Sequence, residues 1–162
     1  MALNDFVVNT PRPLPVILLC DTSGSMSVDG KIEALNEAVR QMINTFAQES
    51  RIRAEIQVGL ITFGQRVNEH LPLSAAKDIT DISPMQAAGM TPLGAALKRT
   101  CMLLEDKDII PSRAYRPVIV LVSDGYATDD WEAPLEDLNR SERASKASRF
   151  AMAIGQDADR IM

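Results

Sequence analysis

The stretch PVILLCDTSGSMS, residues 15–27, decides the fold. Its residues 16–20 are apolar without alternation, and they run directly into Asp21 and a series of small polar residues. A continuous apolar run of this kind is typical of a strand that is covered on both faces, as in a parallel sheet. The stretch therefore predicts a buried strand that ends in a loop of oxygen-bearing side chains.

A second apolar run ends in the same way. Residues 118–122 are aliphatic, and in RPVIVLVSDG (116–125) they lead into Asp124. In open sheets of parallel strands, ligands bind at the edge where the carboxyl ends of the strands meet. Asp21 and Asp124 are therefore expected at one edge of the sheet.

The rest of the chain alternates between strand and helix patterns. Apolar residues at helical spacing predict a helix over 31–48, and EIQVGLITFG (55–64) predicts a second strand. The more polar RVNEHLPLS (66–74) contains Pro72, which suits an edge strand in a hairpin with the strand before it. Further predictions are helices over 92–108 and 131–146, a buried strand over 149–155 and the start of a helix over 157–162.

Strands that alternate with helices indicate an α/β fold. The expected architecture is a doubly wound, mostly parallel sheet with helices on both faces and one antiparallel edge strand. We assign residues 14–162 to this domain and residues 1–13 to an N-terminal arm. In TPRPLP (10–15), the prolines remove backbone donors and are expected to prevent regular structure.

Composition argues against several classes of function. The 162 residues suit one domain, and a net charge of −5 argues against binding to nucleic acid or to an anionic membrane surface. Neither a signal-peptide pattern nor a membrane-length apolar run is recognised, so a cytoplasmic location is expected. His70, in the edge strand, is expected at the surface, and Cys20 and Cys101 are expected to be small buried hydrophobes without a disulfide.

Five side chains with oxygen donors follow the ends of these elements. They are Asp21, Ser23 and Ser25 in the first loop, Thr91 in GMTPLG before a helix, and Asp124 in the third loop. None of them offers nitrogen or sulfur. Hard divalent cations such as Mg²⁺ or Mn²⁺ suit oxygen donors, whereas zinc prefers histidine or cysteine. The set therefore predicts a magnesium or manganese site.

Each loop taken alone has a simpler explanation. Asp21 and Ser23 are good caps for a following turn, Thr91 is a good helix N-cap, and Asp124 followed by Gly125 is a common turn. The coincidence of all three favours the metal site. Gly24, Gly89 and Gly125 are expected to let the loops approach closely.

The apolar and aromatic side chains near these loops leave two alternatives open. Met26 either shapes the rim of the site or packs in the core, while Met85, Met90 and Met102 are expected to fill irregular gaps. Tyr126 and Trp131 follow the third loop, where they either form an aromatic rim or pack against the next helix.

Asp21-Thr22-Ser23-Gly24-Ser25 resembles the D-x-S-x-S motif of von Willebrand factor A (VWA) domains. Thr91 and Asp124 match the other two loops of that family's metal-ion-dependent adhesion site (MIDAS), and the resemblance covers residues 14–162. It implies that Ser23 and Ser25 ligate the ion directly and that Thr91 does so directly or through water. Asp21 and Asp124 would act mainly through bound waters.

This resemblance also implies a function. A shell of neutral hydroxyls and waters leaves the cation partly unneutralised, so an Asp or Glu from a protein partner can replace one water. The expected function is therefore a metal-dependent protein-interaction module without catalytic activity. It would bind neither nucleic acid nor membrane.

Several motifs suggest a subtype. VILLCDTSGSM (16–26), GLITFG (59–64), GMTPLGAAL (89–97) and LVSDGYATDDW (121–131) resemble bacterial cytoplasmic TerY-like proteins of tellurite resistance and stress response. Alternatives are a VWA partner of an AAA-type ATPase or of a metal chelatase. A magnesium-dependent phosphohydrolase is disfavoured because the first loop lacks P-loop spacing and has Ser23 where a haloacid dehalogenase has a second aspartate.

One departure from the family pattern concerns the end of the chain. VWA domains usually have strand order 3-2-1-4-5-6 and a final helix, but this chain ends soon after the strand near 149–154. That strand would then form an open, mostly apolar edge, which favours pairing between chains. The chain is expected to be a truncated form or to self-associate through 149–154.

Overall fold

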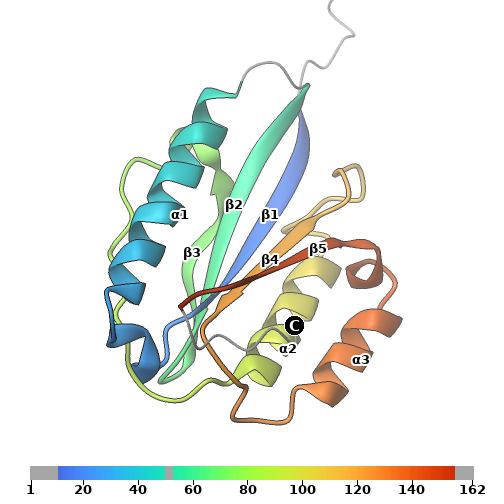
Figure 1. Cartoon of the computed structure of the whole chain (residues 1–162). Coiled ribbons are helices and arrows are strands. Elements are labelled where there is room, and N and C mark those ends of the chain that lie inside the picture. The colour runs from blue at the N-terminus through green and yellow to red at the C-terminus, as the bar shows by residue number, and fades with distance from the viewer. Residues whose placement is uncertain (1–10, 50–52, 156–162) are drawn as a thin grey trace, which may run out of the picture.

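The computed structural model describes residues 11–49 and 53–155. Its five-stranded sheet has the order β3-β2-β1-β4-β5, in which β3 runs antiparallel to β2 and the other neighbours are parallel (Figure 1). The strands are β1 (Arg12–Asp21), β2 (Ala54–Phe63), β3 (Val67–Ala75), β4 (Val118–Ser123) and β5 (Ser148–Ala153). The predicted architecture, including its antiparallel edge strand, is confirmed.

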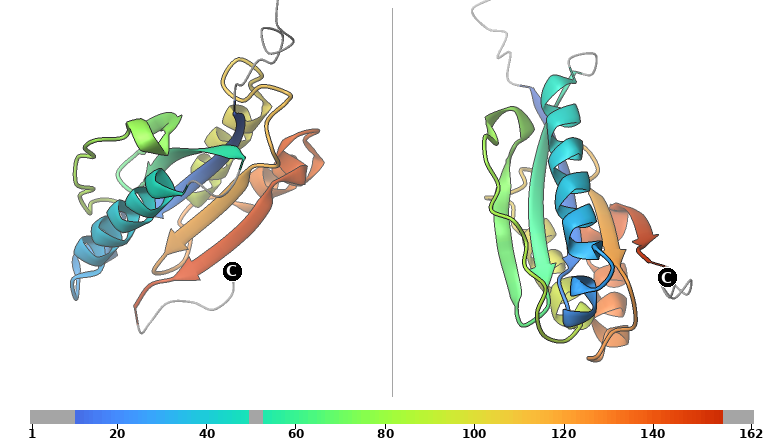
Figure 2. Two further views of the ribbon diagram at one scale, coloured as in Figure 1. Left: turned by 90° about the horizontal axis from the view of Figure 1, so that it is seen from above. Right: turned by 60° about the vertical axis from the view of Figure 1, so that its left-hand side comes forward.

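Helices cover both faces of the sheet. They are α1 (Lys31–Gln48), α2 (Leu93–Glu105) and α3 (Glu132–Arg140), with short 3-10 turns η2 (Gly24–Ser27), η3 (Ala76–Asp78) and η4 (Ala144–Lys146). α1 lies on one face, and α2 and α3 lie on the other (Figures 1 and 2). No helix in the described part of the chain is long and apolar enough to cross a membrane.

The central strand β1 is buried on both faces, as its unbroken apolar run predicts. Leu18 and Cys20 pack into the cluster under α1, whereas Ile17 and Leu19 pack into the cluster under α2 and α3. Because successive side chains of a strand point to opposite faces, both layers fix the position of β1. This rigid strand carries Asp21 to the edge of the sheet.

The expectation that TPRPLP lacks regular structure is wrong, because β1 already begins at Arg12. Pro13 and Pro15 pair with β2 in register, while the pairing of β1 with β4 starts only at Val16. In a parallel strand, alternate residues direct their backbone groups to opposite neighbours, and the Pro13 carbonyl accepts the Tyr115 N–H at 2.8 Å on the β4 side. The missing N–H groups therefore face a side where no ladder bond is lost. Residues 1–10 of the expected arm lie outside the described residues.

Two helices are shorter than their patterns predict. α2 ends at Glu105 instead of residue 108, and the Asp106 carboxylate accepts the N–H of Asp108 at 2.9 Å in the turn that follows. α3 ends at Arg140 instead of residue 146. Beyond it, Glu105 Oε1 accepts the N–H groups of Arg143 and Ala144, both at 2.8 Å, and so holds this segment in a separate turn.

Strand β5 forms where it was predicted, but it is not buried. Among the described residues its one neighbour is β4, and Phe150 and Met152 are 61% and 54% exposed. A strand at the end of a sheet has an unpaired edge, which explains why apolar composition did not guarantee burial here. The helix start predicted over 157–162 lies outside the described residues.

Gly94 in the first turn of α2 allows this helix to lie close to the loop after β4. A Cβ at this position would come within 2.0 Å of the Asp130 carbonyl oxygen. We expect Gly94→Ala to lower the free energy of unfolding by about 2 kcal/mol, measured by urea denaturation, because the backbone must shift. Gly125→Ala is the matched control, since a Cβ there meets nothing within 4 Å. Equal stability of the two variants would contradict the close packing of Gly94.

Candidate metal centre

Two loops meet at the carboxyl edge of the parallel strands, which is the lower edge in Figure 1. The Gly24 N–H donates to the Gly89 carbonyl at 2.9 Å, and the Ala88 N–H donates to the Thr22 carbonyl at 2.8 Å. Gly89 has a φ of 86°, and a Cβ there would come within 2.4 Å of the Gln65 Cα. The predicted close approach is therefore confirmed at Gly89. A Cβ at Gly24 would meet only ordinary contacts of 3.5 Å or more, and a Cβ at Gly125 would meet nothing within 4 Å, so the prediction is wrong for Gly125.

The third loop is joined to the second by its own bonds. The Thr128 N–H donates to the Thr91 carbonyl, and the Thr128 hydroxyl accepts the Thr91 N–H, both at 2.9 Å. The Asp129 carboxylate accepts the N–H groups of Gly94 and Ala95 at 2.8 and 3.0 Å. Asp129 thus accepts the free N–H groups in the first turn of α2, while the Thr91 side chain makes no capping bond there. Thr91, 8% exposed, is therefore not explained as an N-cap.

Asp21 is fully buried beneath the loops. Its Oδ1 accepts the Ser23 N–H at 2.8 Å, and its Oδ2 accepts the Ser123 hydroxyl at 2.6 Å. The carboxylate therefore holds the first loop against the end of β4. Sequence reasoning missed Ser123 as the second partner of Asp21, although it lies directly beside Asp124 in the SDG motif.

Ser23, Ser25 and Asp124 form a row of oxygens between the first and third loops. The hydroxyls of Ser23 and Ser25 lie 3.0 Å apart, and the Ser25 hydroxyl donates to Asp124 Oδ1 at 2.9 Å. The structure therefore brings these three predicted residues into direct contact, with Asp21 bonded to the Ser23 backbone. Thr91 reaches the same edge through the backbone bonds of its loop.

Sequence reasoning also missed Lys31, the first residue of α1. Its Nζ lies 3.1 Å from Asp124 Oδ2, and the two side chains are 15% and 2% exposed. The sequence shows a lysine a few residues after D-x-S-x-S, but nothing in the local pattern indicates that Asp124 is its partner.

The donor set fits a hard cation. In the regions 11–49 and 53–155, no cluster of three or more His, Cys, Asp and Glu side chains could hold an ion. A metal at this edge would therefore depend on hydroxyl oxygens together with Asp21 and Asp124. Oxygen donors of this type suit Mg²⁺ or Mn²⁺, which retain bound waters and tolerate neutral ligands.

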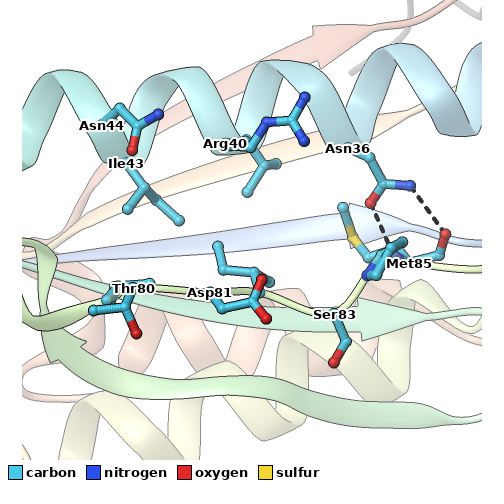
Figure 3. A pocket seen from close by; sticks show the side chains of 12 residues that line it. Asn36, Arg40, Ile43, Asn44, Thr80, Asp81, Ser83 and Met85 are labelled. Atoms are coloured by element: carbon cyan, nitrogen blue, oxygen red, sulfur yellow. Dashed lines mark hydrogen bonds between the residues drawn. The ribbon is translucent and has the colours of Figure 1, made fainter.

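Asn36 on α1 positions the segment that leads into the second loop. Its side-chain amide donates to the Met85 carbonyl at 3.0 Å and accepts the Met85 N–H at 2.8 Å (Figure 3). A groove of about 250 Å³ lies beside this contact, between α1 and residues 79–85. The two bonds pair the Asn36 amide with both backbone groups of Met85. They therefore hold the backbone at residue 85 against α1, a few positions before Gly89.

Residues around the site resolve the alternatives left by the sequence. Met26 is fully buried, so it belongs to the core, and Met85 is also buried. Met90 and Met102 are 65% and 58% exposed, so their predicted role as fillers of gaps is wrong. Tyr126 and Trp131 are 74% and 39% exposed, so neither is buried by packing against α3. His70 is half-buried, and its Nε2 lies 2.6 Å from the Ser83 carbonyl oxygen.

Cys20, next to Asp21, gives a test of burial under the site. Burial, together with the neighbouring Asp21 carboxylate, raises the pKa of its thiol to about 12. A raised pKa leaves the thiol protonated and unreactive at pH 8. We expect one thiol per native chain to react with a disulfide reagent at this pH, at the half-buried Cys101. Cys101→Ser should then show no reaction until urea unfolds the protein; rapid native labelling of that variant would contradict the burial of Cys20.

The model of the von Willebrand factor type A domain matches residues 16–127. Zinc-occupied proximal thread matrix protein 1 from the mussel byssus is similar in fold, with a TM-score of 0.68 and 21% identity over 90% of this chain and 39% of that chain. Manganese-loaded TRAP protein from Plasmodium vivax has a TM-score of 0.64 and 20% identity over 92% of this chain and 60% of that chain.

A third solved structure is also similar in fold. The ArnB paralog VWA2 from Sulfolobus acidocaldarius has a TM-score of 0.62 and 17% identity over 90% of this chain and 36% of that chain. The chain thus spans less than two thirds of the length of each of these proteins, and similarities at such low identity show the fold alone. No curated protein matches the chain.

Proposed function

Because the chain belongs to the von Willebrand factor type A domain family, we propose that it is a metal-ion-dependent protein-interaction module without catalytic activity. In this proposal Ser23, Ser25 and Thr91 hold Mg²⁺ or Mn²⁺, with Asp21 and Asp124 acting through bound waters. An Asp or Glu of a protein partner completes the shell. The observation that carries the proposal is the row of Ser23, Ser25 and Asp124 oxygens, in which consecutive atoms lie 3.0 and 2.9 Å apart.

Exposed apolar side chains on the same loops support a role in protein recognition. Val28, Met90 and Tyr126 are 51%, 65% and 74% exposed, and they follow or belong to the first, second and third loops respectively. Interface centres combine apolar anchors with a few directional polar contacts. The proposed partner therefore carries its carboxylate beside apolar residues.

The proposal is tested by capture of partners from a bacterial lysate on the immobilised protein. Capture is performed in Mg²⁺ and in EDTA, with wild type and the double variant Ser23→Ala/Ser25→Ala. Proteins bound by wild type in Mg²⁺ and lost in both other conditions support the proposal. Partners that remain bound in EDTA would contradict metal dependence, and turnover of an aryl phosphate that requires Ser23 and Ser25 would favour a phosphohydrolase.

The pathway is a finer part of the proposal. The TerY-like motifs quoted above support a cytoplasmic role in a bacterial stress or tellurite-resistance system. A partner identified by capture as a kinase- or phosphatase-like protein would agree with this assignment. An AAA-type ATPase or a metal chelatase subunit in its place would favour the alternative subtype.

We further propose that two chains pair through β5. Among the described residues no strand lies beyond β5, and Phe150 and Met152 expose apolar surface on it. We expect light scattering to show a mass that rises with concentration, and Met152→Lys to keep the chain monomeric because a buried charge opposes pairing. Met102→Lys on α2, which is similarly exposed, is the matched control. A wild-type protein that stays monomeric at high concentration would contradict pairing.

A further inference from the structure

Lys31 occupies a position that local helix preferences do not explain. It is the first residue of α1, where the helix dipole is positive and a cation is unfavourable. The N-terminal turn of a helix normally favours acidic residues, such as Glu33 in this first turn. The placement of Lys31 therefore points to a stabilising partner outside its own helix.

That partner is Asp124. The Lys31 Nζ lies 3.1 Å from Asp124 Oδ2, while Asp124 Oδ1 accepts the Ser25 hydroxyl at 2.9 Å. The ammonium group thus neutralises the same carboxylate that belongs to the candidate metal centre. An unpaired carboxylate at 2% exposure would be costly, so this contact keeps the third loop in place without a divalent ion.

Packing confines the Lys31 side chain beside the centre. A Cβ at Gly155 would come within 2.8 Å of Lys31 Cε and 3.4 Å of Nζ, so the backbone after β5 lies against the lysine stem. The side chain is only 15% exposed. Its charge therefore stays close to any cation that Ser25 and Asp124 hold.

We propose that Lys31 is an affinity-setting residue, a tethered cation that pairs with Asp124 in the metal-free domain and weakens divalent-ion binding. This inference rests on the proposed metal site. Before ion binding, Asp21, Asp124 and Lys31 together carry one net negative charge. After a divalent ion binds, the same centre carries one net positive charge, which a partner's carboxylate would neutralise.

The test measures Mn²⁺ affinity by electron paramagnetic resonance of the free ion. We expect Lys31→Met and Lys31→Gln to bind Mn²⁺ about tenfold more tightly, because a like charge near the ion is removed. Lys31→Arg should bind like wild type. Lys77→Met gives the same change in net charge at an exposed residue of η3 and should also bind like wild type. Lys31→Gln retains a hydrogen-bond donor for Asp124, which protects the fold if Lys31→Met fails to fold.

Thermal unfolding in EDTA provides the second readout. Lys31→Met should melt at a lower temperature than wild type in EDTA. Added Mn²⁺ should raise the melting temperature of this variant by more than it raises that of wild type. Unchanged or weaker Mn²⁺ affinity in Lys31→Gln would overturn this inference while leaving the proposed metal site intact. Absence of Mn²⁺ binding in wild type and in every variant would overturn both.

Discussion

Replacement of Asp21 by alanine is expected to abolish divalent-ion binding and to lower the free energy of unfolding by about 3 kcal/mol. The carboxylate is fully buried, and it accepts the Ser23 N–H and the Ser123 hydroxyl. Its removal leaves two buried donors without partners and takes away one negative charge near the ion. Urea denaturation in EDTA measures the stability, and a Mn²⁺ titration measures the binding.

Two variants separate these effects. Asp21→Asn keeps the shape of the side chain and an oxygen for the Ser23 N–H, so it should lose ion affinity with a smaller loss of stability. Asp81→Ala removes an exposed carboxylate from the segment before the second loop and should change neither quantity. If Asp21→Ala bound Mn²⁺ as tightly as wild type, Asp21 would have only a structural role.

The double variant Ser23→Ala/Ser25→Ala is expected to lose ion affinity with little change in the free energy of unfolding. Ion affinity should fall by about a hundredfold or more, since two proposed direct ligands are lost. Stability in EDTA should change by less than about 1 kcal/mol, because the two hydroxyls bond to each other and are removed together, and Asp124 stays paired with Lys31. Calorimetric titration with Mn²⁺ and urea denaturation provide the two measurements.

Ser27→Ala is the matched control for the serine variant. Ser27 lies in the same loop, is exposed, and donates its hydroxyl to the Gly24 carbonyl at 2.7 Å. It should retain Mn²⁺ binding. A similar loss of affinity in Ser27→Ala would mean that loop conformation, and not hydroxyl ligation, determines binding.

The sequence predicted the sheet and its edge because both depend on local patterns. Unbroken apolar runs identified β1 and β4, and the carboxyl ends of these strands placed Asp21 and Asp124 together. The serines of D-x-S-x-S followed directly from Asp21. To predict these residues, no distant contact had to be known beyond the rule that the carboxyl ends of parallel strands meet at one edge of the sheet.

The residues that were missed depend on contacts between distant parts of the chain. Ser123 bonds to Asp21, 102 positions away, and Lys31 bonds to Asp124, 93 positions away. Asp129 accepts the N–H of Gly94 in α2, which lies 35 positions earlier in the chain. No local pattern specifies such pairs, because each depends on how the loops are folded against one another.

The errors in the fold have a similar origin. Pro13 is compatible with β1 only because β4 does not extend beside it, and β5 is exposed because it is the last strand of the sheet in the part of the chain that the structure describes. Local rules for proline and for apolar runs assume neighbours on both sides of a strand. Whether a neighbour is present is decided by the whole sheet.

The most direct measurement is a titration of the metal-free protein with Mn²⁺, followed by electron paramagnetic resonance. The proposed site predicts that each wild-type chain takes up one ion at millimolar concentration or below and that Ser23→Ala/Ser25→Ala takes up none in this range. No uptake by the wild type, or equal uptake by the two proteins, would contradict the proposal that the three loops form a metal centre.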